Sequence, residues 1–142
     1  PSLSSAIRAL EAQSFFEAPF WHGTPPAYFR FARIVNDPSH AAGWVDHAGR
    51  HPLQSEEQES GYRVLKTIRH ALAHGNVVYV NERGHEVPGE RVRFLAFLSR
   101  NNRHHRVAIF DEESFRAFLK AWIAWIQEFP PEFEFVFGEA AE

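Results

Sequence analysis

Residues 55–80 read SEEQESGYRVLKTIRHALAHGNVVYV, and the hydrophobic period of this stretch changes at Gly75. Before the glycine, apolar side chains recur at helical spacing, whereas residues 77–80 have the composition of a strand. We therefore expect a helix over residues 54–74, capped by Ser55 and ended by Gly75, with acidic residues in its first turns, where the helix dipole favours anions. The expected apolar stripe consists of Val64, Leu65, Ile68, Ala71 and Leu72.

Three other segments have helical patterns. Residues 3–17 predict a helix because Leu and Ile recur at helical spacing and Ala is frequent, and a shorter helix is expected across residues 27–35. A polar loop is expected over residues 39–52. The last predicted helix, residues 112–129, is capped by Asp111, and its apolar face is too broad for one ordinary core stripe. That face is either deeply buried or shared with a partner subunit.

Short β-rich runs lie between the two strongest helices. Three strands are expected, in residues 77–80, 92–98 and 106–110, and their closeness in sequence predicts a small antiparallel meander. We treat this meander as an insertion, spanning about residues 76–110, in a mainly α-helical bundle. The predicted organisation is a single domain over residues 1–129, followed by an acidic tail over residues 130–142.

Composition excludes several classes of site. The 142 residues contain no cysteine, which rules out disulfides, a thiol nucleophile and Cys-ligated zinc. No apolar run approaches the roughly 18 residues of a membrane span, and the first residues lack a signal-peptide pattern, so we expect a cytoplasmic protein without membrane contact. The formal charge of −3 hides an asymmetry, because residues 1–110 carry a net +3 and residues 111–142 a net −6. The mildly basic body permits phosphate binding.

Metal-independent RNA cleavage needs three groups. A base takes the proton from the ribose 2′-hydroxyl, a cation stabilises charge on the phosphate, and an acid assists departure of the 5′-oxygen. Histidine suits proton transfer because its pKa lies near neutrality, and arginine suits the phosphate because its planar guanidinium keeps its charge. Arg69 and His74 supply one of each within two helical turns.

The segment from Arg69 to Asn76, RHALAHGN, resembles the Arg-x4-6-His motif of HEPN domains, in which a polar residue such as His70 follows the arginine. The resemblance implies a helical bundle that forms homodimers in which two motifs meet. It also implies a metal-independent endoribonuclease that leaves a 2′,3′-cyclic phosphate and a 5′-hydroxyl, often as a toxin controlled by an antitoxin or in phage defence. Arg69 and His74 would be catalytic, with His70 assisting and no cofactor or metal. Asn76 stands where one toxin subgroup has a tyrosine that its antitoxin modifies.

The spacing of these residues has a geometric consequence. On an ideal helix Arg69 and His74 lie roughly 140° apart, whereas His70 and His74 are only about 40° apart. A partner subunit could bring the arginine and the histidine together. Further RNA contacts are expected from a mostly basic set, in part on the same helix and in part in the segment Arg100–Arg106. The alternative for this segment is a solvated loop tip. The set is Arg63, Lys66, Asn76, Arg103 and Arg106.

Other interpretations of the same residues stay open at this point. His70 and His74, four residues apart, could bind a metal ion with a third ligand from His85, His104 or His105. The chain could also be a non-catalytic module that binds RNA, a nucleotide or a partner protein through the same surface. A third possibility is an accessory protein that binds its partner through the last helix.

Overall fold

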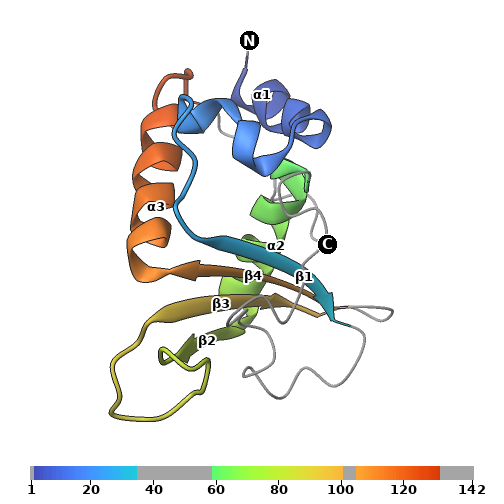
Figure 1. Cartoon of the computed structure of the whole chain (residues 1–142). Helices are drawn as coiled ribbons and strands as arrows, with labels where there is room; N and C mark the ends of the chain where they lie inside the picture. Colours follow the sequence, from blue (N-terminus) through green and yellow to red (C-terminus); the bar gives the residue numbers. More distant parts are fainter. Residues whose placement is uncertain (1, 35–58, 101–104, 132–142) are drawn as a thin grey trace.

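The computed structural model describes residues 2–34, 59–100 and 105–131 (Figure 1). Within these ranges, one strand lies between the first two helices, and three consecutive strands lie between the second and third. The helices are α1 (Leu3–Ala9), α2 (Gly61–His74) and α3 (Glu112–Ile126), and the strands are β1 (Phe29–Ile34), β2 (Val77–Val80), β3 (Phe94–Ser99) and β4 (His105–Asp111). Three single-turn 3-10 helices, Leu10–Ala12, Phe15–Glu17 and Pro19–Trp21, connect α1 to β1.

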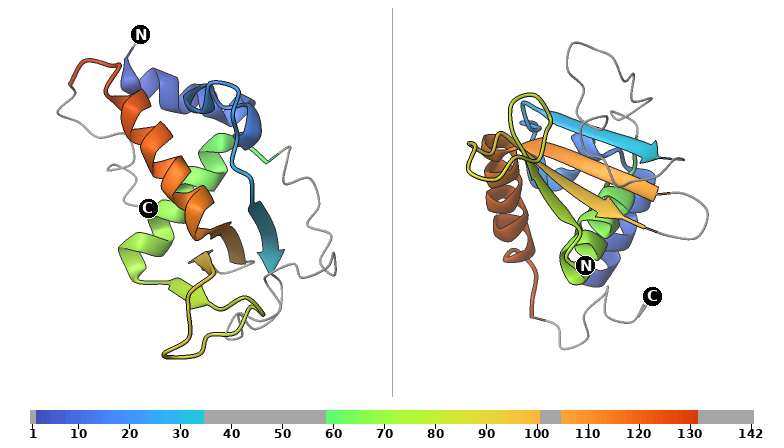
Figure 2. Two further views of the ribbon diagram at one scale, coloured as in Figure 1. Left: turned by 60° about the vertical axis from the view of Figure 1, so that its left-hand side comes forward. Right: turned by 90° about the horizontal axis from the view of Figure 1, so that it is seen from below.

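The four strands form one antiparallel sheet in the order β1-β4-β3-β2. The predicted meander is confirmed, since β2, β3 and β4 pair consecutively. The predicted mainly α-helical bundle with a β insertion is wrong, because the sheet also takes in β1, which precedes α2 in the chain. The sheet is therefore the centre of a mixed α/β fold, and α2 and α3 lie on the same face of it (Figure 2).

The predicted helix over residues 27–35 is wrong, and the segment forms β1 instead. Phe29 and Phe31 are buried in the core that faces the helices, whereas their neighbours Tyr28 and Arg30 are only half-buried. This alternation is typical of a strand. Six residues of β1 pair with β4, from Phe29 opposite Phe110 to Ile34 opposite His105. This long-range pairing outweighs the weak local preference for a helix.

The predicted helix over residues 3–17 is also shorter in the structure. The α-helix ends at Ala9, and Gln13 is extended. Gly61 donates its backbone N–H to the carbonyl oxygen of Gln13 at 2.9 Å, and Phe15 donates to the carbonyl oxygen of Glu59 at 2.6 Å. A continued helix would use these backbone groups internally. Pairing with the segment before α2 therefore breaks the first helix and holds the N-terminal region against α2.

The main core lies between the sheet and the helices and is unusually aromatic. Phe15 is fully buried at its centre, and its ring lies within 6.3 Å, centroid to centroid, of six other rings. These rings belong to Phe16, Phe20, Trp21, Phe29, Phe110 and Phe118. The alternate side chains of β3 and β4 form a second buried cluster on the other face of the sheet. Apolar residues on both faces explain why these strands read as continuous apolar runs.

Helix α2 begins and ends with local capping interactions. The Ser60 hydroxyl accepts the backbone N–H of Arg63 at 3.1 Å, so Ser60 is the N-cap, while the expected cap Ser55 lies outside the described residues. The predicted stop at Gly75 is confirmed, with a left-handed φ of 70°. Asn76 donates its backbone N–H to Ala71 and Gly75 donates to Leu72, the paired bonds of a Schellman motif.

A glycine pair provides a test of this helix end. We expect Gly75→Ala to lower the free energy of unfolding by about 1–2 kcal/mol, because an alanine Cβ disfavours left-handed backbone even though no atom lies within 4 Å of its position. Gly61→Ala is the matched control. At position 61 the added Cβ makes only ordinary contacts, the nearest at 3.6 Å, so urea denaturation should show equal or higher stability by up to about 1 kcal/mol. Equal stability of Gly75→Ala and the parent protein would contradict this account.

Helix α3 begins where the sequence predicts. The Asp111 carboxylate accepts the backbone N–H of Ser114 at 2.8 Å, which confirms the cap. The broad apolar face divides in two: Phe118 and Trp125 are buried, whereas Leu119 and Ile123 are 39% and 49% exposed. The acidic tail beyond residue 131 and the expected loop over residues 39–52 lie outside the described residues. Among the described segments, no helix combines the length and apolar character needed to cross a bilayer.

Candidate functional site

A groove of about 570 Å³ runs along the polar side of α2. Of the side chains predicted for the site, the groove brings together Arg63, Lys66 and His70 from α2 with Arg106 from β4. Ser99, the last residue of β3, lies beside them. The complete lining is Glu11, Glu59, Ser60, Tyr62, Arg63, Lys66, Thr67, His70, Ser99 and Arg106.

Backbone pairing brings the N-terminal segment to the start of α2. Ser14 and Ser60 form an isolated antiparallel bridge, which places the N-terminal segment beside the first turn of α2. Glu11 from this segment and Glu59 from the residues before α2 both line the groove. At the other end of α2, Leu98 of β3 donates its backbone N–H to the carbonyl oxygen of Asn76 at 3.0 Å. The helix is thus tied at both ends, so the spacing between its polar side and the sheet is well defined.

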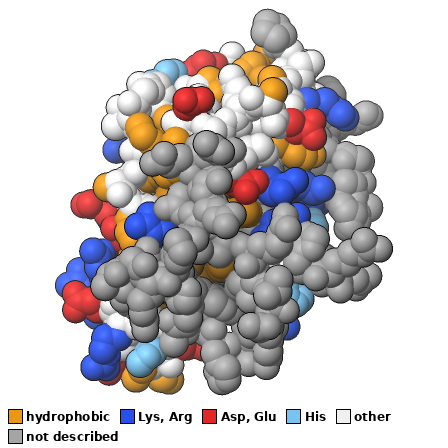
Figure 3. All heavy atoms as spheres, turned by 45° about the vertical axis from the view of Figure 1, so that its right-hand side comes forward, with side chains coloured by type: hydrophobic (Ala, Val, Ile, Leu, Met, Phe, Trp, Pro, Cys, Tyr) orange, Lys and Arg blue, Asp and Glu red, His pale blue; other side chains and the backbone are white. Residues whose placement is uncertain are grey.

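The charges in the groove favour an anionic ligand, but only mildly. Its three permanent cations, Arg63, Lys66 and Arg106, face two carboxylates, so the lining carries a net charge of +1 with neutral histidine. Arg63 Nε lies 3.5 Å from the Glu59 carboxylate, and Lys66 Nζ lies 5.9 Å from the centre of the Tyr62 ring. The face in Figure 3 likewise shows Lys and Arg side chains in separate groups with acidic side chains among them. Such a surface suits a few phosphate contacts rather than a long basic track.

Two imidazoles lie next to one another on α2. The ring centroids of His70 and His74 are 6.1 Å apart, with an angle of 86° between the ring planes. His70 is half-buried, and its Nδ1 lies 3.4 Å from the Ser99 hydroxyl oxygen. His74 is exposed and does not line the groove. This arrangement matches the angular separation of about 40° expected for the pair.

The structure does not bring Arg69 and His74 together in this groove. Arg69 is half-buried on α2 and is not part of the groove lining. Asn76 follows Gly75, and both of its backbone groups are used to end α2 and to join β3. Arg103 and His104 lie outside the described residues. Within residues 2–34, 59–100 and 105–131, no three His, Cys, Asp or Glu side chains are grouped closely enough to hold a metal ion.

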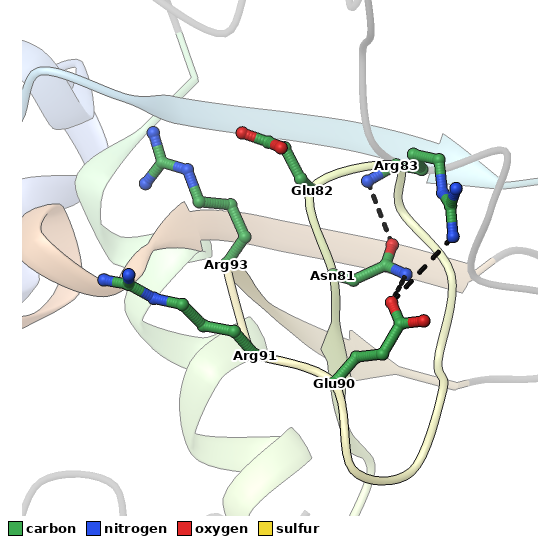
Figure 4. Close-up of a pocket in the computed structure, with 6 residues that line it drawn as sticks. All are labelled: Asn81, Glu82, Arg83, Glu90, Arg91 and Arg93. Atoms are coloured by element: carbon green, nitrogen blue, oxygen red, sulfur yellow. Dashed lines mark hydrogen bonds and ion pairs between the residues drawn. The ribbon is translucent and has the colours of Figure 1, made fainter.

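A second cavity, of about 610 Å³, lies in the loop between β2 and β3 (Figure 4). It contains three arginines, but Arg83 pairs with Glu90 at 3.9 Å and Arg93 pairs with Asp111 at 3.5 Å. The buried Asn81 organises this loop. Its side-chain oxygen accepts two backbone N–H groups, and its amide donates to Glu90 at 2.6 Å. Two of the three arginines of this cavity are thus paired with carboxylates, and none of its lining residues was predicted for the site.

Sequence reasoning missed Ser99, Glu11 and Glu59 as groove residues. Ser99 ends an apolar strand, and only its β-strand position next to Arg106, its partner in β4, could have drawn attention to it. Glu11 comes from a segment with no pattern that links it to α2. Comparison of the chain with protein-family models, with curated proteins and with solved structures gave no significant match.

Proposed function

We propose that this protein binds single-stranded RNA through the groove on α2 and cleaves it without a metal ion. The observation that carries the proposal is that four side chains selected from the sequence, Arg63, Lys66, His70 and Arg106, line one groove. The His74 imidazole lies immediately beside it. Unpaired RNA is the substrate class because single-stranded nucleotides can adopt the in-line geometry that 2′-hydroxyl attack requires.

The proposed chemistry is an internal transesterification. His74 takes the proton of the ribose 2′-hydroxyl while the 2′-oxygen forms a bond to phosphorus. The bond from phosphorus to the 5′-oxygen breaks, and the proton is returned to that oxygen, so the imidazole is regenerated. The products are a 2′,3′-cyclic phosphate and a 5′-hydroxyl. Arg63, Lys66 and Arg106 hold the phosphates, and His70 assists from within the groove.

A homodimer is part of the proposal. Arg69 does not line the groove, so its predicted role as a phosphate clamp needs a second copy of the chain. Large apolar side chains are available for such contact, since Leu72, Leu119 and Ile123 are 39–59% exposed. Action in the cytoplasm, as a toxin with an antitoxin or in defence, also belongs to the proposal. It rests on the RHALAHGN segment and its likeness to HEPN ribonucleases.

The basic test is cleavage of end-labelled single-stranded RNA in EDTA. Cleavage that gives a 2′,3′-cyclic phosphate supports the enzyme, whereas binding without cleavage supports the non-catalytic module. Loss of cleavage in EDTA would contradict a metal-independent reaction and support the histidines as metal ligands. Mixing Arg69→Ala with His74→Ala tests the shared site. If each site takes its arginine and histidine from different subunits, the mixture recovers activity that neither variant has alone.

Groove variants provide a separate binding test. We expect Arg63→Ala and Lys66→Ala each to weaken RNA binding and to reduce the slope of log Kd against log salt by about 0.7, because each loses one phosphate contact. Arg116→Ala is the matched control, since this arginine is exposed on α3 and pairs only locally with Glu112, at 3.3 Å. Titrations by fluorescence anisotropy at several salt concentrations measure both quantities. If the groove variants bind like Arg116→Ala, the groove is not the RNA site.

A further inference from the structure

We infer that Ser99 holds the neutral imidazole of His70 in the tautomer that carries its proton on Nε2, so that His70 serves the reaction as a hydrogen-bond donor to phosphate and leaves proton transfer to His74. This inference rests on the proposed function for the role of the two histidines. The assignment of the tautomer itself starts from the contact between β3 and α2 and does not depend on catalysis.

The Ser99 hydroxyl contacts the His70 ring from the end of β3. Ser99 ends β3, opposite Arg106 in β4, and is 9% exposed. Its oxygen lies 3.4 Å from His70 Nδ1. Within the part of the chain that the structure describes, this is the one hydrogen-bonding contact of the Ser99 side chain. Because no other acceptor for this hydroxyl proton lies among the described residues, we assign the hydroxyl as the donor and Nδ1 as the acceptor.

Donation to Nδ1 determines the chemistry of the ring. An imidazole nitrogen that accepts a hydrogen bond carries no proton, so the proton of neutral His70 is on Nε2. In this form Nε2–H can donate to a non-bridging phosphate oxygen and stabilise the charge that builds there. Nε2 cannot at the same time accept the 2′-hydroxyl proton.

The base must then be the other ring. His74 is exposed, four residues further along α2, with its ring centroid 6.1 Å from that of His70. Ser99 is thus a positioning residue that acts through His70. The two adjacent histidines have different tasks because only His70 faces the buried end of β3.

The tautomer can be measured directly on ¹⁵N-labelled protein by long-range ¹H–¹⁵N correlation at about pH 8, where an ordinary imidazole is neutral. In the parent protein we expect His70 to show a protonated Nε2 and an unprotonated Nδ1. Ser99→Ala should broaden the His70 signals or shift them toward a mixture, and Ser99→Thr, which keeps the hydroxyl, should restore them. Thr67→Val removes another groove hydroxyl, which bonds to the Arg63 carbonyl at 2.9 Å, and should leave the His70 tautomer unchanged. A proton on Nδ1 in the parent protein overturns the inference.

A kinetic readout completes the test. Ser99→Ala should lower kcat by about tenfold to a hundredfold, as expected for a misplaced catalytic group, with KM nearly unchanged and with recovery in Ser99→Thr. A change in KM alone contradicts a role through His70. Failure of the proposed function is distinguishable, because absence of RNA cleavage by the parent protein would leave the tautomer result standing.

Discussion

Replacing His74 with alanine is expected to lower the rate of RNA cleavage by about 10²- to 10⁴-fold, the usual effect of removing a general acid–base group. The imidazole of His74 is exposed, lies beside His70 and is outside the groove lining, so its removal should affect the chemical step more than binding. Single-turnover cleavage at saturating protein measures the chemical step, and anisotropy with a non-cleavable 2′-deoxy substrate measures binding.

His85→Ala is the matched control for this experiment. His85 is an exposed histidine in the loop between β2 and β3, and its described hydrogen bonds are made by its backbone to Asn81. Its removal should leave the cleavage rate unchanged. If His74→Ala cleaves RNA at the rate of the parent protein, His74 has no catalytic role. Equal losses in His74→Ala and His85→Ala would indicate a general effect of histidine removal instead.

Replacing Phe15 with alanine is expected to lower the free energy of unfolding by about 3–5 kcal/mol, the range for loss of a buried phenylalanine. Phe15 is fully buried and contacts rings from the N-terminal segment, from β1, from β4 and from α3. Because these elements meet around one ring, the cavity cannot close by moving a single side chain. Since small domains have only about 5–15 kcal/mol of total stability, this one substitution should remove a large share of the free energy of unfolding.

Urea denaturation followed by tryptophan fluorescence measures this loss, because Trp21 lies 5.5 Å from Phe15 in the same core. Val87→Ala, at an exposed position of the β2–β3 loop, should change stability by less than about 0.5 kcal/mol. A loss below about 1 kcal/mol for Phe15→Ala would mean that Phe15 is not at the centre of the core. A fall in the dependence on urea concentration, with the midpoint preserved, would instead indicate an altered unfolded state.

Local features of the chain were predicted well because their causes are local. The end of α2 at Gly75 follows from the one residue type that readily adopts left-handed backbone, and the start of α3 follows from the Asp111 carboxylate three residues before the Ser114 N–H. The β2-β3-β4 meander joins strands that are neighbours in sequence. Arg63, Lys66 and His70 were found together because they lie within two turns of one helix.

The sequence by itself thus determined the motif helix, its C-terminal end at Gly75 and the cations and histidines of its polar side, whereas its first residue, Gly61, and its N-cap, Ser60, were not predicted. Tertiary structure alone decided that residues 29–34 form β1, because the strand depends on pairing with β4, more than seventy residues away. It also decided that Ser99, Arg106 and Glu11 join the groove, and that Arg69 does not line it. Helical periodicity predicts which side chains share one face of a helix. Which segment packs against that face depends on hydrogen bonds and burial between residues far apart in the sequence, and periodicity does not report these.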